Sequence, residues 1–150
     1  MAKYFVYSEF IKSETAKKLN IDNTPKEEYI QDNILEMMRM MDKIRERWTD
    51  YCEDNCLLHP QIIVNSGYRS DALNKAVKGS KTSAHKIGTA CDFEAKNGHN
   101  KELFEVAMEV LKDIPFEEMI NEKDYSWIHL ALKSMNGEQK REIIGYDGKN

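Results

Sequence analysis

The chain has 150 residues, of which 41% are hydrophobic and 32% are charged, and its formal net charge at pH 7 is −4. This length predicts a single domain over residues 1–150, because a chain of this size buries about two-thirds of the surface that its unfolded form exposes. The acidic balance and the lack of any block of Lys or Arg argue against a protein that tracks nucleic-acid phosphates, so neutral or polar partners are expected.

The first residues, MAKYFVYSEF, show neither a cationic segment followed by a long apolar run nor a small-residue cleavage site. No apolar stretch of the sequence approaches the ~20 residues that a bilayer-spanning helix needs. The three cysteines are an odd number, which fits a reducing compartment better than a disulfide framework. We therefore expect a protein that is made in the cytoplasm without a signal peptide and does not insert into a membrane.

Helix signals fill the first third of the chain. Ser8 and Ser13 are predicted N-caps, the first for a helical turn and the second for a helix that runs to about Leu19. Residues 24–27, TPKE, have the pattern of a capping box with Pro at the first helical position, which predicts a helix start. A long amphipathic helix then runs to roughly Tyr51, and its methionines are expected to fill the core. The apolar residues at helical spacing are Ile30, Ile34, Met37, Met38, Met41, Ile44 and Trp48.

The middle and the end of the chain alternate between short strand and helix signals. Residues 61–65 form a β-branched run that Ser66-Gly67 closes, and residues 70–71 can cap a short helix through Val77. A set of helices followed by a small mixed set of strands predicts an α+β fold rather than a doubly wound sheet. Further strands are predicted over residues 89–94, 116–121, 127–132 and 142–146, and a helix over residues 101–112.

One spacing in the sequence suggests a metal site. His85 and Asp92 lie seven residues apart, in a loop and in the strand that follows it, and the small residues Gly88 and Ala90 leave room for an ion between them. His129, on a later predicted strand, is the third candidate ligand. Two histidines and one carboxylate form a known catalytic zinc set. On spacing alone, the alternative stays open that the three are a capping aspartate, a loop histidine and a half-buried strand histidine.

Three motifs, in this order, resemble those of the zinc D-alanyl-D-alanine carboxypeptidase family. Residues 83–92, SAHKIGTACD, resemble its S-x-H-x-x-G-x-A-x-D signature. Residues 66–80 begin with SGYRS and contain the Leu-Asn and Gly-Ser pairs that precede the signature in this family, and residues 127–129, WIH, resemble its W-h-H segment. The opening from Tyr4 to Pro25 resembles the start of a compact phage and bacterial branch. The family includes the vancomycin-resistance dipeptidases and phage L-alanyl-D-glutamate endopeptidases, and it shares its fold with the Hedgehog signalling domain.

The resemblance implies a fold and a set of site residues. The fold would have N-terminal helices packed on a small, mostly antiparallel sheet, as in the DD-peptidase and Hedgehog domains. Zinc would be held by His85, Asp92 and His129. Arg69 would hold a carbonyl or carboxylate of the substrate, since a guanidinium presents a planar donor fork to such oxygens. Ser83 would bond the substrate or the metal shell, or else only cap the loop.

The residue that would accept the proton of the attacking water is not at its usual position. Better-known members carry Glu or Asp three residues before the last His, where this chain has Ser126, and a serine cannot accept that proton at neutral pH. If the two strands that flank the intervening turn pair antiparallel, Glu122 lies near His129 and is the first candidate. Asp124, in the turn itself, is the second candidate.

A function follows from the resemblance as an expectation. It implies a zinc metallopeptidase that acts on the stem peptide of bacterial peptidoglycan and cuts a bond next to a D-amino acid, as a carboxypeptidase or an endopeptidase. A chain made without a signal peptide fits a phage lysis enzyme or a virion-packaged hydrolase that meets the cell wall after release, and a monomer is expected. Two alternatives remain open: a zinc-stabilised binding or structural module of the same fold without turnover, which Ser126 favours, and an unrelated acidic helical binder.

A second group of metal-binding residue types lies at the end of the long helix. Cys52, Cys56 and His59 have a spacing that admits a structural zinc or a redox pair. No fourth ligand is evident nearby in the sequence, so two packed thiols and a surface histidine are the favoured interpretation. Cys91 is expected to face the core because it alternates with Asp92 along its strand. His99, in KNGHNK, is expected in a solvated turn.

Overall fold

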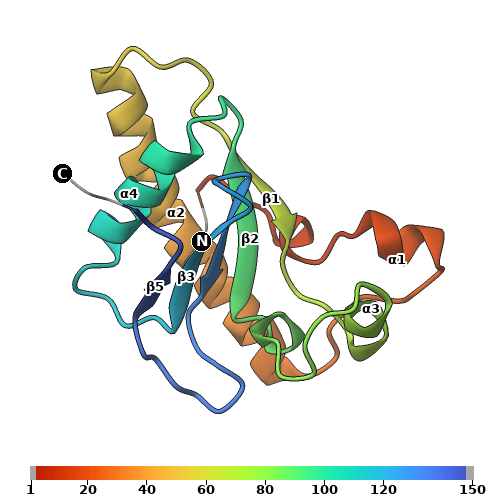
Figure 1. Cartoon of the computed structure of the whole chain (residues 1–150). Helices are drawn as coiled ribbons and strands as arrows, with labels where there is room; N and C mark the ends of the chain where they lie inside the picture. The colour runs from red at the N-terminus through yellow and green to blue at the C-terminus, as the bar shows by residue number, and fades with distance from the viewer. Residues whose placement is uncertain (1–2, 148–150) are drawn as a thin grey trace.

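The computed structural model describes residues 3–147, which form an α+β fold (Figure 1). The long helix α2 (Glu28–Asp54) and α4 (Asn100–Val110) pack side by side on one face of a five-stranded sheet. The short helices α1 (Glu14–Lys18) and α3 (Asp71–Ala76) lie next to each other, away from α4. The predicted fold class is confirmed. Every helix within residues 3–147 is too short or too polar to cross a bilayer.

The sheet has the strand order β1-β2-β4-β3-β5. All neighbouring strands are antiparallel except the edge pair of β3 and β5, which is parallel. The sheet is thus mostly antiparallel, and each strand falls within about two residues of a predicted one. The strands are β1 (Ile62–Ser66), β2 (Ala90–Ala95), β3 (Glu118–Glu122), β4 (Trp127–Ala131) and β5 (Glu142–Ile144).

Alternation along the strands divides the sheet into a core face and an open face. Cys91 and Phe93 of β2 and Ile128 and Leu130 of β4 are fully buried against the helices. The four methionines of α2 between residues 37 and 41 are buried in the same core, as the sequence predicts. The strand residues between these core positions point the other way, so polar side chains gather on the open face.

The start of α2 differs from the predicted capping box. The helix begins at Glu28, and the side chain of its N-cap, Glu27, makes no capping hydrogen bond. Asp22 instead accepts a hydrogen bond from the backbone N–H of Thr24 at 3.0 Å, which holds this segment in a turn before the helix. The prediction that the helix starts within TPKE is therefore wrong by about one turn.

The two predicted N-caps near the start of the chain have different outcomes. Ser13 caps α1, because its Oγ accepts a hydrogen bond from the N–H of Ala16 at 3.1 Å. Ser8 lies inside the 3-10 helix η1 (Tyr7–Phe10), whose N-cap is Val6. The side chain of Glu9 accepts a hydrogen bond from the backbone N–H of Val6 at 2.9 Å. The cap prediction is thus confirmed for Ser13 and wrong for Ser8.

Candidate metal site

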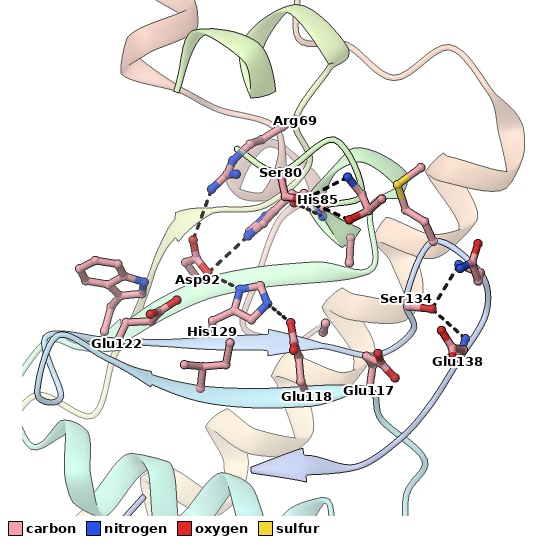
Figure 2. Close-up of a pocket in the computed structure, with 18 residues that line it drawn as sticks. Arg69, Ser80, His85, Asp92, Glu117, Glu118, Glu122, His129, Ser134 and Glu138 are labelled. Carbon is pink, nitrogen blue, oxygen red and sulfur yellow. Dashed lines mark hydrogen bonds and ion pairs between the residues drawn. The ribbon is translucent and has the colours of Figure 1, made fainter. Parts of the chain in front are cut away.

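Three side chains from two strands and one turn meet on the open face of the sheet (Figure 2). Asp92 of β2 and His129 of β4 lie directly opposite each other in the ladder, with Nδ1 of His129 2.8 Å from Oδ1 of Asp92. The 3-10 helix η2 (Ala84–Ile87) brings Nε2 of His85 to 3.4 Å from the same oxygen. One ligand atom from each residue lies within 4.8 Å of the other two. The structure thus brings together the three residues that the sequence singles out as ligands.

The ring of His85 has one nitrogen bonded and one nitrogen free. Its Nδ1 lies 2.6 Å from the carbonyl oxygen of Gly67, and because a carbonyl only accepts, Nδ1 carries the proton. Nε2 of the neutral ring therefore carries a lone pair and no proton. Its contact with Asp92 at 3.4 Å is not a hydrogen bond. This nitrogen is buried and lacks a hydrogen-bond partner among the described residues. A buried lone pair beside a carboxylate and a second imidazole is the donor set that zinc prefers, so the residues fit this metal.

Local features hold His85 in this position. The Oγ of Ser83 accepts a hydrogen bond from the N–H of His85 at 3.2 Å and caps η2. Gly88 ends η2 in the left-handed conformation, with φ of +79°, which a glycine adopts without strain. A Cβ on Gly67 would lie 2.4 Å from the carbonyl oxygen of Phe10, so only glycine lets the two backbone segments come this close. In this position the Gly67 carbonyl accepts from His85. Ser83 also lines the cavity beside the site. Its contact with a substrate stays a prediction.

The imidazole of His129 stands between two carboxylates, because Nε2 lies 3.3 Å from Oε1 of Glu118. Burial lowers the pKa of His129, but hydrogen bonds with Asp92 and Glu118 outweigh it and raise the pKa to about 9. Burial also raises the pKa of Asp92, but its contacts with His129 and His85 hold that pKa well below its usual range. Glu118 has no role in the sequence-based prediction. Strand alternation puts Glu118 on the same face of β3 as the predicted base Glu122, but its contact with His129 depends on the register with β4, in which Ile120 pairs with His129.

Raising the pH should destabilise the metal-free protein. The pKa of His129 rises from 6.5 to about 9 on folding, so the folded state holds this proton more tightly. The resulting stability is complete below pH 6.5 and is lost as the pH rises through about 9. The full shift corresponds to at most about 3 kcal/mol in the free energy of unfolding. Urea unfolding with chelator present, below pH 6.5 and above pH 9, measures it. The variant His129→Gln should show a smaller loss over the same range, and an equal loss in both proteins would contradict the assignment.

Arg69 faces the same cavity from the loop after β1. Its Nε and Nη1 donate to Oγ of Ser66 and Oδ1 of Asn74, each at 3.3 Å, and its Nη2 lies 3.6 Å from Oδ2 of Asp92. Gly79 packs behind the guanidinium, where a Cβ would lie 2.1 Å from Oδ1 of Asn74. Only 18% of the Arg69 side chain is exposed. It is thus a fixed cation at the site, in a position that suits the predicted contact with a substrate oxygen.

The two predicted proton acceptors lie in different environments. Glu122 is the ladder partner of Trp127, and its side chain lines the cavity. Asp124 is exposed in the turn after β3, has φ of +53°, and is not among the residues that line the cavity. Ser126 also lies outside the lining, and its Oγ donates to the carbonyl oxygen of Lys123 at 2.7 Å. Of the two candidates, the structure brings Glu122 to the site and leaves Asp124 outside it.

The cavity beside these residues has a volume of about 680 Å³, which lies in the range of ligand-binding clefts. One part of its wall is the segment after β4, which includes Ser134 and Glu138 (Figure 2). Among the described residues that line it, Arg69 is the one lysine or arginine. The acidic residues of the lining are Asp92, Glu117, Glu118, Glu122 and Glu138. The cleft therefore suits a polar ligand that carries both signs of charge.

Cys52, Cys56 and His59 do not form a second site. Cys52 is buried, and its Sγ lies 3.6 Å from Nδ2 of Asn97. Cys56 is exposed, so the expectation of two packed thiols is wrong for this residue. The reason is that α2 ends at Asp54, so Cys56, in a left-handed conformation with φ of +56°, no longer continues the helix face on which Cys52 is buried. Within residues 3–147, the group on η2, β2 and β4 is the one set of three or more potential metal ligands.

The other two residues considered in the sequence lie as expected. Cys91 is fully buried on the core face of β2, and burial raises the pKa of its thiol well above the ordinary value. His99 precedes α4 with its side chain 44% exposed, and its Nδ1 lies 3.7 Å from Oε2 of Glu102. Neither residue takes part in the site.

Comparison with known proteins adds a family to this geometry. A protein-family model described as Peptidase M15 matches residues 3–131, a range that contains all the side chains of the cluster and both Arg69 and Glu122. No curated protein matches the chain.

Proposed function

The chain belongs to the peptidase M15 family, and on this premise we propose that it is a zinc-dependent peptidase that cuts a bond next to a D-amino acid in bacterial peptidoglycan. The family membership confirms the resemblance noted in the sequence and indicates a metallopeptidase. The observation that carries the proposal is the buried, unpartnered Nε2 of His85 beside Asp92 and His129. Most buried polar atoms of side chains have a partner, and a metal ion would supply the one that this nitrogen lacks.

The proposed metal ligands are Nε2 of His85, a carboxylate oxygen of Asp92 and Nδ1 of His129. Zinc in such a site supplies a Lewis acid, which polarises a carbonyl group and lowers the pKa of a water molecule toward neutrality. The chain's own residues perform the remaining tasks. The guanidinium of Arg69 binds a carbonyl or carboxylate oxygen of the peptide and orients it.

Glu122 is the proposed general base. As water adds to the carbonyl carbon of the scissile bond, a carboxylate oxygen of Glu122 accepts a proton from it. Glu122 then gives this proton to the amide nitrogen, the C–N bond breaks, and the products are a carboxylate and a free amine. No hydrogen bond or ion pair occupies the Glu122 side chain within residues 3–147, so both of its oxygens are available for this transfer.

The substrate class rests on the family resemblance and on the cleft. Stem peptides of peptidoglycan carry carboxylates and amines, and the cleft offers one fixed cation, Arg69, and several glutamates. The likeness to a compact phage and bacterial branch extends the proposal to a phage lysis enzyme or a virion-packaged hydrolase that acts as a monomer.

One feature favours a second candidate, a zinc-stabilised module of the same fold without turnover. Ser126 occupies the position at which better-known members carry their acidic residue. Glu122 lines the cleft from the end of β3 and could replace the missing acidic residue as proton acceptor. The two candidates differ in whether the zinc-bound protein releases peptides.

Removing the metal tests the proposal. Purified protein should contain about one zinc per chain and release soluble peptides from purified peptidoglycan. A chelator should stop the release, and one equivalent of zinc should restore it. Mass spectrometry of the products identifies the bond that is cut. Release that persists in protein shown to be free of metal would contradict the proposal, and zinc without release would favour the inactive module.

A further inference from the structure

The pocket face of β3 carries two glutamates on either side of His129. Alternation puts Glu118, Ile120 and Glu122 on this face, and all three line the cavity. Ile120 is the ladder partner of His129, so each glutamate lies one pocket-facing position away from that point, in opposite directions along the strand. The two carboxylates are therefore placed alike with respect to the backbone, but their side chains make different contacts.

Glu118 forms an ion-pair contact with His129, whereas Glu122 does not. Oε1 of Glu118 lies 3.3 Å from Nε2 of His129, and the other ring nitrogen, Nδ1, faces Asp92 at 2.8 Å. In the metal-free protein a carboxylate thus accepts at each ring nitrogen, whereas an imidazole that binds a metal has one N–H and one lone pair. A metal ion at Nδ1 would take the place of the proton that faces Asp92, and the one remaining proton, on Nε2, would then face Glu118.

We propose that Glu118 is a positioning residue, which fixes the tautomer and the orientation of His129 so that Nδ1 is presented to the metal. This inference rests on the proposed function, since it concerns the same metal. It separates the two glutamates of β3, with Glu118 acting through His129 and Glu122 acting on the substrate.

The rest of the site supports this division. His85 is fixed in the same way by the Gly67 carbonyl, so each histidine has an outer acceptor on the nitrogen that faces away from the cluster. Such outer partners are a general feature of histidine ligands, and a carboxylate partner also makes the ring a stronger donor. β3 is held between β4 and β5, and Glu118 is in register with both, which fixes its backbone.

The test compares Glu118→Ala, Glu118→Gln and, as the matched control on the same strand and face, Glu122→Ala. Competition with a chromophoric chelator measures the dissociation constant for zinc. We expect Glu118→Ala to weaken zinc binding by about 10–100-fold, the usual effect of losing an outer partner of a ligand. Glu118→Gln keeps an acceptor oxygen and should recover most of this loss. Glu122→Ala should bind zinc within about twofold of the wild type, because it contacts no ligand.

A spectroscopic measurement reports the hydrogen bond itself. In ¹H–¹⁵N spectra of the zinc-loaded protein, a proton on Nε2 of His129 should be visible in the wild type and in Glu118→Gln. In Glu118→Ala it should disappear through exchange with water. A merely structural role of Glu118 would not predict this loss or its rescue by glutamine.

The outcomes are distinguishable from those that test the proposed function. Tight zinc binding by Glu118→Ala, or an equal loss in Glu122→Ala, overturns the role of Glu118 while leaving the peptidase in place. Zinc binding that follows the expected order without any release of peptides overturns the peptidase and leaves Glu118 in its role. A wild-type chain that binds no zinc overturns both.

Discussion

Replacing Glu122 with Gln should lower the rate of peptidoglycan hydrolysis by about 10²–10⁴-fold, the usual contribution of a general base. Glutamine has nearly the same shape but cannot accept a proton from water. Zinc content should stay at the wild-type level, because Glu122 makes no contact with His85, Asp92 or His129 within residues 3–147. The measurement is peptide release and metal content on the same purified samples.

The matched control is Asp124→Asn, which removes the second predicted base. Asp124 is exposed in a left-handed turn that asparagine adopts readily, and it is not among the residues that line the cleft. This variant should hydrolyse peptidoglycan at close to the wild-type rate. If Asp124→Asn lost the activity and Glu122→Gln kept it, the base would be Asp124, and the turn would have to move toward the substrate. Equal rates in all three proteins would exclude both carboxylates.

Much of the site could be predicted because the motifs carry their own local geometry. A tight turn at Gly88 followed by a strand fixes how His85 and Asp92 lie relative to each other, whatever surrounds them. Strand alternation likewise decides that Cys91 faces the core and Asp92 does not. Short-range features of this kind can be derived from residue types and spacing alone.

Other parts depend on contacts that the sequence does not encode locally. The contact of Glu118 with His129 follows from the register between β3 and β4, which a single sequence leaves open by one residue or more. The capping box before α2 is absent because Asp22 bonds the N–H of Thr24, an equally local alternative. The exposure of Cys56 follows from where α2 ends, and helix ends are the least certain feature of a sequence-based prediction.

Replacing His85 with Ala should have the largest effect on the metal. It removes a ligand itself, so the loss of zinc affinity should exceed the roughly 10–100-fold that removal of an outer partner causes. The activity should be lost with the zinc, since no other imidazole is near the cluster within residues 3–147. The side chain is also 2% exposed, and its removal leaves the Gly67 carbonyl without a donor. A fall of about 1–3 kcal/mol in the free energy of unfolding of the metal-free protein is therefore expected as well.

The control for this variant is His99→Ala, which removes a half-exposed histidine at the start of α4, outside the metal site. It should bind zinc like the wild type, and a weakening of zinc binding there would show that the assay reports surface histidines. Metal content and unfolding must be measured together on His85→Ala, because a misfolded protein would also lose zinc. A folded His85→Ala that keeps its zinc would contradict the assignment of His85, and the buried Nε2 would then need a different partner. A folded variant that loses both zinc and peptide release would show that hydrolysis depends on the zinc held by Nε2 of His85. An inactive zinc-stabilised module would show no peptide release to lose.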